Sequence, residues 1–516
     1  MRRTLLMISI WVAVSASPSG QAPAMPAAAQ PETLRLTVND AVKMALDHNI
    51  ELAAERITPQ IGDTQIAAAA GAFRPTFNTG LQRNNQLEPP SSFLVPTPTR
   101  NDAVTTTLGL FQRLPWYGTS YSVSWDYVHT SSDSFLNSYN PVLQSGLSVS
   151  LSQPLVRDLA IDSARLQLAS SRVNRAIADT RLRETLVQTV ANVKSAYWNL
   201  VTAIANVGAR TSTLDLAREL VRVNKVKVGY GQSPPLDLVS AQAEVAADQE
   251  QLIIAETAVK EAEDVLRTLI FDTSDRSAWR VGLEPADSPP LGLASPDLEA
   301  AVTAALKDRT DLVRARKEID NADLTVRFTD NQRRPDVRLN ASYQANGLGG
   351  TQVLRTGGFP GTIVGPGAET GFGSVMNQVF SANYPTWFVG VSFNYPIGQS
   401  TEHANHARAT LEDQQARERL KSAESRAILQ VRDAWRKIEM NARRIETARA
   451  ARQLAEQRLE AERKRFDAGM STSFLVIQAQ RDLAQARTNE IGAILAYDLA
   501  LVEFEAIQQA GRATGG

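Results

Sequence analysis

Ala41-Val42-Lys43-Met44-Ala45-Leu46 returns later in the chain as Ala301-Val302-Thr303-Ala304-Ala305-Leu306, and this repetition decides the fold. The same distance separates Arg74-Pro75 from Arg334-Pro335 (335 − 75 = 260). A fixed offset between matching segments is the sequence signature of an internal repeat. We infer that a long unit has been duplicated, and that each copy begins with an apolar-periodic segment that predicts a helix.

A second set of matches lies further along the chain, at a different distance. Gly231 corresponds to Gly469 (469 − 231 = 238), and Gln153-Pro154-Leu155 corresponds to Tyr395-Pro396-Ile397. The duplicated unit therefore changes length in its middle. Both halves are expected to keep one order of elements: helix, alternating strands, very long helix, tight turn, helix.

Six stretches alternate apolar with small polar residues at a period of two. Alternate side chains of a strand face opposite sides, so each stretch has one apolar face and one polar face. Membrane strands are about 9–11 residues long and carry aromatic girdles near their ends. The stretches are Phe77–Leu81, Val104–Leu110, Tyr121–Tyr127, Leu147–Leu151, Val337–Tyr343 and Val389–Tyr395. The nearby aromatic residues are Trp116, Tyr117, Trp125, Tyr127, Tyr384, Trp387 and Tyr395.

The strands alone leave two architectures open. A soluble sandwich with one solvated face fits the alternation, and so does a membrane barrel. Single-chain barrels need about eight strands, and open edges are not tolerated in lipid. Six strands in a membrane would therefore require a barrel shared by several chains.

Long helices are predicted in both halves. The stretch from about Ile161 to Val228 has no Pro and one Gly, and its apolar residues from Leu186 to Val207 are spaced alternately by four and three. This is a heptad seam, typical of coiled-coil packing, and the helix would be roughly 100 Å long. The second copy runs from about Glu402 to Phe466. Partner helices are expected at about 236–270 and 474–507, and shorter ones at about 38–72 and 297–333.

Two tight turns join these long helices. Gly229 to Pro235 forms the first, and Gly469 to Ser473 the second. Gly suits a helix C-cap and Ser or Thr the next N-cap, while Pro is tolerated at a helix start. Each half is therefore expected to end in a helical hairpin.

Composition limits the function. Lys plus Arg number 54 and Asp plus Glu 55, a net charge of −1 that gives no reason to expect nucleic acid as a partner. No Cys is present, which excludes disulfides and thiolate sites. Arg2 and Arg3 before an apolar run from Leu5 to Val14 predict an export signal, too short to span a membrane. No later run predicts a transmembrane helix.

Signs of catalysis are absent from the sequence. No Gly-rich phosphate loop follows a strand, and no nucleophile motif occurs. His403 and His406, beside Glu402, have a spacing that suits a metal, although solvated residues at a helix start explain them equally well. We expect no enzyme activity, no cofactor and no metal. The stretch from Gly347 to Gly373 is rich in Gly, Thr and Pro, and predicts an exposed loop.

Duplication, strands, long helices and export together resemble the TolC-type outer-membrane channels, the outer membrane efflux proteins. The segment Ala41–Leu52 resembles the family's opening helix, and Ala305–Leu312 its second copy. Arg465–Ser471 and Leu475–Gln480 are similar to the segments around the helical tip. The resemblance implies a homotrimer in outer-membrane lipid, with a periplasmic adaptor protein and an inner-membrane transporter docking at the tips. It implies an exit duct for efflux or type I secretion.

Two features depart from the family pattern. Family members usually contribute four strands per chain, whereas an extra hairpin is expected here around Pro115-Trp116-Tyr117-Gly118. It either widens the barrel to six strands per chain or lies outside the wall. At the second tip, Leu475 and Gln478 occupy positions where relatives often place Asp.

The resemblance also implies a polar lock at the tips. Asp237 would be one member, and the positions of its Tyr and Arg partners hold Phe466 and Ser471, of which Phe466 cannot donate a hydrogen bond. A weak lock and little cation selectivity are therefore expected. The candidate residues of the channel entrance at the periplasmic tips are Gly231, Asp237, Phe466, Gly469, Ser471, Leu475 and Gln478.

The sequence thus predicts an α+β membrane protein: an internally duplicated, trimeric transmembrane β-barrel continued by a long antiparallel α-helical coiled-coil periplasmic tunnel. We expect a signal peptide and linker at 1–29, a first repeat at 30–275, a linker at 276–296, a second repeat at 297–510 and a disordered tail at 511–516. The location would be the outer membrane of a Gram-negative-type cell. The alternative is an exported coiled-coil structural or adhesion protein whose strands form a soluble sheet.

Overall fold

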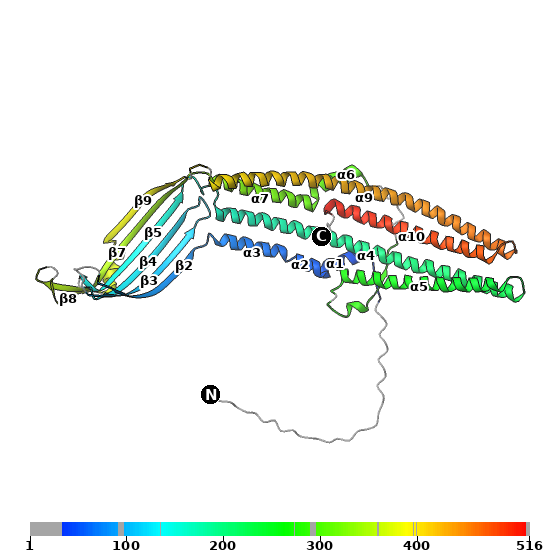
Figure 1. The fold of residues 1–516 in the computed structure, drawn as a ribbon, viewed down its shortest axis with the longest axis horizontal. Helices are drawn as coiled ribbons and strands as arrows, with labels where there is room; N and C mark the ends of the chain where they lie inside the picture. Colours follow the sequence, from blue (N-terminus) through cyan, green and yellow to red (C-terminus); the bar gives the residue numbers. More distant parts are fainter. Residues whose placement is uncertain are drawn as a thin grey trace, which may run out of the picture.

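The computed structural model is an elongated molecule with a β-sheet at one end and long helices running away from it (Figure 1). It describes residues 33–90, 97–134, 136–272, 274–288, 296–358, 361–395, 397–398 and 400–511. The predicted export signal and the C-terminal tail after Gly511 lie outside the described residues. No helix in the described ranges is long and apolar enough to cross a membrane.

All six alternating stretches are strands of one antiparallel sheet, as predicted. The strands lie in the order β2-β3-β4-β5-β7 within this sheet. Strand β9 pairs with β7 on the side away from β5, and β8 pairs with the C-terminal part of β7. The extra hairpin β3–β4 thus lies inside the sheet, between β2 and β5. The strands are β2 (Thr76–Glu88), β3 (Thr99–Arg113), β4 (Ser120–Ser132), β5 (Tyr139–Pro154), β7 (Asp336–Thr356), β8 (Thr362–Thr370) and β9 (Tyr384–Asn394).

The prediction of an exposed loop from Gly347 to Gly373 is wrong. Strand β7 continues to Thr356, β8 pairs back onto it, and a short helix, α8 (Phe372–Phe380), follows. Backbone pairing from Gly350 to Thr356 stabilises a hairpin that a Gly-rich composition did not reveal.

The long helices occur where they were predicted. They are α4 (Ser163–Gly229) and α5 (Pro235–Ile270) in the first half, and α9 (Thr401–Asp467) and α10 (Ser473–Gln509) in the second. They lie side by side in the order α5, α4, α10, α9 (Figure 1). The two hairpins therefore meet through α4 and α10.

Each shorter predicted helix is broken into pieces. The first region contains α1 (Val38–His48), α2 (Ile50–Glu55) and α3 (Thr58–Gly71), and the second contains α6 (Leu298–Asp308) and α7 (Thr310–Gln332). Asn49 breaks the first run because its side chain accepts a hydrogen bond from the Leu52 N–H, 2.9 Å away, and so starts a new helix. Arg309 lies at the matching break in the second half (309 − 49 = 260).

The heptad seam is buried at its centre and more exposed toward its ends. Val193, Tyr197 and Leu200 are fully buried against α1 and α5, whereas Leu186 and Ile204 are exposed in the single chain. A small parallel pair, β1 (Thr33–Leu36) and β6 (Gly282–Pro285), closes this core and was not predicted.

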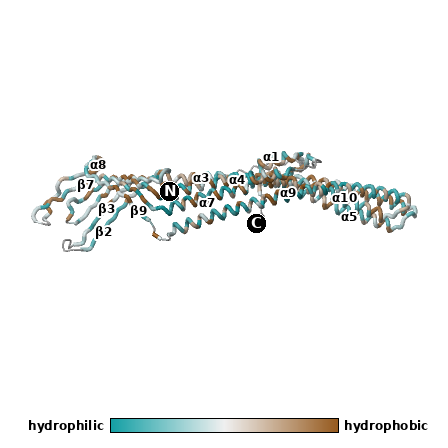
Figure 2. The backbone as a smooth tube through the Cα atoms, turned by 90° about the horizontal axis from the view of Figure 1, so that it is seen from above, coloured by the Kyte–Doolittle hydropathy of each residue, from teal (hydrophilic) through white to brown (hydrophobic). Residues whose placement is uncertain are grey.

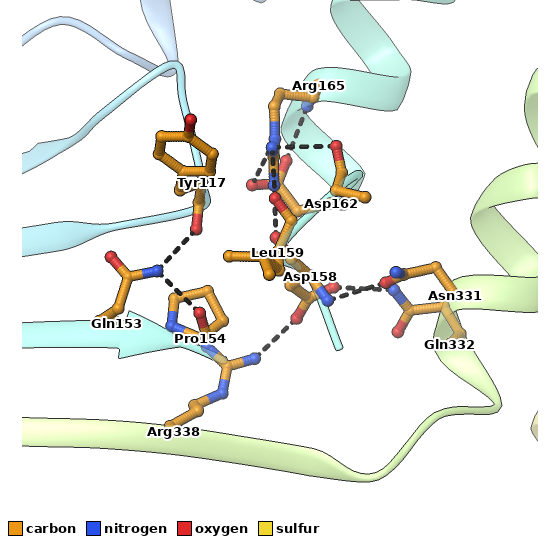
Figure 3. A network of polar contacts seen from close by, with 11 residues as sticks. Tyr117, Gln153, Pro154, Asp158, Leu159, Asp162, Arg165, Asn331, Gln332 and Arg338 are labelled. Atoms are coloured by element: carbon orange, nitrogen blue, oxygen red, sulfur yellow. Dashed lines mark hydrogen bonds and ion pairs between the residues drawn. The ribbon is translucent and has the colours of Figure 1, made fainter. Parts of the chain in front are cut away.

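A polar network joins the sheet to the helices (Figure 3). Asp158 lies between β5 and α4, and its N–H donates to Asn331 Oδ1 at 2.7 Å. Its carboxylate accepts from Gln332 Nε2 at 2.8 Å and from the Arg338 guanidinium at 2.7 Å. The connection from β5 to α4 is thereby hydrogen-bonded to the connection from α7 to β7. These contacts fix the spacing between the two halves where their helices join the sheet.

Candidate channel wall and helical tips

Six strands form a wall in which the alternation of all strands is in phase. We call β2, β3, β4, β5, β7 and β9 the wall strands. Side chains directly opposite one another in a sheet share a face. One row across all six strands is apolar, and the next row is polar or glycine. The apolar row is Phe77, Leu110, Val123, Val149, Tyr343 and Trp387. The polar row is Asn78, Gly109, Ser124, Ser148, Gln344 and Thr386.

This register gives the wall one apolar face and one polar face. On the apolar face, Phe77 is 68% exposed and Trp387 74% exposed in the single chain. On the polar face, Ser124 and Ser148 share a hydrogen bond of 2.6 Å between their hydroxyls. Large exposed apolar surfaces mark contact with a protein or a membrane.

Among the described residues, the wall ends in two unpaired edges. Every residue of β2 is exposed, and β9 is exposed along nearly its whole length. Each neighbouring pair of wall strands is antiparallel, so β2 and β9 run in opposite directions. A copy of the chain placed beside this one would bring β9 next to an antiparallel β2.

At the opposite end of the molecule, both hairpin turns are closed by glycines in the left-handed region. Gly231 has φ +68° and Gly469 has φ +75°. At the first tip, the Gln232 N–H donates to the Lys227 carbonyl at 2.8 Å, and at the second the Met470 N–H donates to that of Arg465 at 2.8 Å. These bonds satisfy the last helical carbonyls, as in a Schellman motif.

The predicted N-caps are not made by side chains. Thr472 occupies the N-cap position of α10 without a side-chain cap hydrogen bond, and α5 follows Pro234, with Pro235 in its first turn. Proline fixes the backbone at a helix start and needs no amide hydrogen there, so α5 begins without a hydroxyl cap.

The two tips of one chain are held together by contacts that the sequence did not reveal. Asn224 is fully buried, and its Nδ2 donates to Ser473 Oγ at 2.7 Å and to the Asp237 carbonyl at 3.2 Å. Lys227 Nζ lies 3.6 Å from the centre of the Phe466 ring and donates to the Phe466 carbonyl at 2.7 Å. A buried Asn within an apolar helical pattern is the signal that could have indicated this site.

The predicted lock residues do not meet one another within the chain. Phe466 is buried beneath Lys227, Ser471 donates to Glu462, and Asp237 is half-buried in the first turn of α5. Leu475 is exposed, and Gln478 Nε2 donates to Asp482 Oδ1 at 3.0 Å. Contacts of these side chains with another copy remain predictions.

The histidines of α9 do not gather further ligands. His406 Nδ1 lies 3.4 Å from Thr329 Oγ1. Within the described ranges, no three His, Asp or Glu side chains come together as a metal site.

A wall with one apolar and one polar face, continued by long helical hairpins, defines the subunit of an elongated membrane channel. The model of the outer membrane efflux protein family matches residues 41–270 and 301–507, well over half of the chain. The chain belongs to the outer membrane efflux protein family. Members of this family are channels rather than enzymes, so this protein is an outer-membrane exit duct for efflux.

Solved structures share the fold. The CmeC outer membrane channel of Campylobacter jejuni is 14% identical, with a TM-score of 0.65 over 92% of this chain and 85% of that one. The outer membrane protein VceC of Vibrio cholerae is 16% identical, with a TM-score of 0.63 over 91% and 96%. CusC is 15% identical, with a TM-score of 0.68 over 96% and 99%. No curated protein sequence matches this chain.

Proposed function

We propose that three copies of this chain form one outer-membrane barrel, with six strands from each copy, and one helical tunnel through the periplasm. The observation that carries the proposal is the wall: its faces are in phase across six strands, and its exposed edges run in opposite directions. Joining β9 of one copy to β2 of the next keeps every pair antiparallel and leaves no open edge. Lipid does not tolerate open edges.

The faces of the wall support the same arrangement. The apolar row of the wall would contact lipid, and the polar row would line a water-filled lumen. Six strands are fewer than the roughly eight of the smallest barrels, so a single chain needs partners to close.

The tips are the proposed docking site for the partners of the duct. Tyr230, Leu236, Met470 and Phe474 are each at least two-thirds exposed at the two turns. Exposed apolar side chains of this size at a helical end suit a protein partner. A periplasmic adaptor protein and an inner-membrane transporter would dock there and pass efflux or type I secretion substrates into the tunnel.

The tip entrance is proposed to have a weak polar lock and little cation selectivity. Phe466 has no hydrogen-bond donor to offer Asp237 of a neighbouring copy, and its ring is already buried beneath Lys227. Leu475 and Gln478 bring no charge to the entrance, and rings of Asp or Glu are what favour cations in a pore.

Membrane fractionation followed by mass determination of the detergent-solubilised particle tests the assembly. A detergent-requiring trimer is expected. A particle that is soluble without detergent would overturn the barrel and favour the exported coiled-coil structural or adhesion protein.

Bilayer recordings test the entrance. The wild-type protein is expected to show a reversal potential near zero in a salt gradient, and the Leu475→Asp, Gln478→Asp double variant is expected to become cation-selective. Val239→Asp, an exposed position in the second turn of α5, serves as the control for an added charge near the tip outside the two predicted entrance positions. Strong cation selectivity of the wild-type channel would contradict the proposed entrance.

A further inference from the structure

Helix α8 lies against the apolar face of the wall, beyond the apolar row, at the end far from the helices (Figure 2). Val375 and Val379 are 0% and 2% exposed because they pack over β7. A Cβ atom at Gly347 would lie 2.4 Å from the Val375 carbonyl oxygen, and one at Gly349 would lie 2.5 Å from Val375 Cγ2. These two glycines follow Tyr343 in steps of two, so they share its apolar face. Their missing side chains make the space that seats the helix.

One flank of α8 is apolar and is turned toward the apolar row. Phe372, Met376 and Phe380 are spaced by four residues and form one stripe along the helix. The Phe372 ring meets Tyr127 edge to face at 4.9 Å between centroids, and Met376 Sδ lies 3.6 Å from Ser145 Oγ. Tyr127 and Ser145 are paired across β4 and β5, four residues beyond the apolar row.

The opposite flank is polar and is turned away from that row. Gln378 Oε1 accepts a hydrogen bond from the Leu348 N–H at 3.0 Å, further out along β7 than the Gly347 position. Ser374 and Asn377 are exposed on this side. The helix therefore lies across the strands with its apolar flank toward the apolar row and its polar flank away from that row.

The described part of the chain leaves the stripe uncovered. Phe372 is 47% exposed and Phe380 72% exposed, and no charged residue occurs from 371 to 383. Helices with one apolar flank lie in the plane of a membrane interface, where aromatic rings are enriched. The stripe is continuous with the proposed lipid-facing surface and lies over β4, β5 and β7 rather than over β2. Lipid is the occupant that this continuity favours.

We propose that α8 is an interfacial helix that places the Phe372–Phe380 flank in the acyl–headgroup boundary of the outward leaflet of the outer membrane. The inference rests on the proposed barrel, because the apolar face must face lipid. The absence of charge means that insertion depends on apolar burial and not on anionic headgroups. The helix and β8 would then hold the long end of β7 at a fixed depth in the membrane.

Site-directed spin labelling tests this assignment cleanly because the chain has no Cys. Single variants carrying a nitroxide are reconstituted in phosphatidylcholine nanodiscs, and collision rates are measured with oxygen, which enters lipid, and with a water-soluble nickel chelate. The variants are Phe380→Cys in the stripe, Ser374→Cys on the polar flank, Val149→Cys in the apolar row and Ser148→Cys in the polar row.

The expected result is a several-fold excess of oxygen over nickel collisions at Phe380→Cys and Val149→Cys, with the reverse at Ser374→Cys and Ser148→Cys. Nickel excess at Phe380→Cys alone would overturn the interfacial helix. Low rates with both reagents at that site would also overturn it, since they indicate a protein cover. Nickel excess at Val149→Cys would overturn the proposed barrel itself. Gly373→Cys, whose side chain meets nothing within 4 Å, repeats the test if Phe380→Cys does not assemble.

Discussion

The two halves of the chain have long helices of nearly identical length and different strands. Helices α4 and α9 each have 67 residues, and α5 and α10 have 36 and 37. In the first half, the outer connection from β2 to β5 contains the hairpin β3–β4, which joins the wall. In the second half, the outer connection from β7 to β9 contains β8 and α8, which stay outside it.

The difference shows which lengths the architecture constrains. The four long helices lie side by side, so a change in one would leave its neighbours unpaired over part of their length. An insertion in an outer connection has no such partner. It enters an antiparallel wall only as a pair of strands, because a single added strand would reverse the direction of every later one.

Deleting residues 99–132 is the strongest test of this comparison. The deletion removes β3 and β4 and makes the first half resemble the second, with β2 pairing directly to β5. Because the rows are in phase, Phe77 would then lie opposite Val149 on the same face. Barrel diameter grows roughly linearly with strand number, so we expect assembly to persist with the single-channel conductance reduced to about half.

Deletion of residues 120–132 alone is the matched control. It removes only β4, which leaves β3 and β5 running in the same direction with too short a connection, and no assembled channel is expected. An unchanged conductance after the larger deletion would show that the β3–β4 hairpin does not contribute to the pore wall.

Much of the fold could be predicted because long regular patterns need few assumptions. Alternation over several residues located all six wall strands, and the Pro-free runs located α4 and α9 within about two residues. The breaks at Asn49 and Arg309 were missed. At Asn49 a single capping side chain outweighs an otherwise helical pattern, whereas Arg309 adopts an extended backbone without a side-chain cap.

Helix α8 could not be predicted because its cause is distant in the sequence. Nine residues with two buried valines form too short a pattern, and the space that seats them comes from Gly347 and Gly349 on β7. The contact between the tips was hidden in the same way: Asn224 and Ser473 are 249 residues apart. The identity of the tip residues was available from the sequence, but their partners required the packing of α4 against α10.

A buried acid in α10 gives a second, smaller test of how far the halves differ. Asp498 corresponds to Lys260 in the first half (498 − 260 = 238), and Lys260 is exposed on α5. Asp498 is 3% exposed, and its burial raises the pKa of the carboxyl to about 6 from 3.8. The folded state binds a proton on the Asp498 carboxyl more tightly than the unfolded state does. Protonation of Asp498 therefore stabilises the folded state fully below pH 3.8, and this stabilisation is lost as the pH rises to about 6.

Asp498→Asn removes the free-energy cost of burying an ionised carboxylate at high pH. At pH 7.5 we expect the variant to be more stable than the wild type by about 2 kcal/mol, with no difference near pH 4. Thermal unfolding midpoints at both pH values measure this, and the variant-minus-wild-type comparison cancels the other carboxylates. Lys260→Asn, at the exposed equivalent, should change stability by less than about 0.5 kcal/mol at either pH. An equal gain for Asp498→Asn at both pH values would contradict the role of the buried charge.

The smallest expected effect concerns the glycines of the two tips, where the halves are alike. Gly231 and Gly469 both have positive φ, and a Cβ at either would meet nothing within 4 Å, so the cost of Gly→Ala comes from the backbone alone. We expect each variant to lose about 1 kcal/mol, by thermal unfolding, and Gly→Asn to lose less, because Asn tolerates this region. Gly208→Ala, within α4 and equally unobstructed, should instead gain about 0.5–1 kcal/mol. A loss at only one tip would show that the turns are not equivalent, and that contacts specific to one tip, such as the cation over the Phe466 ring, determine the stability of that turn.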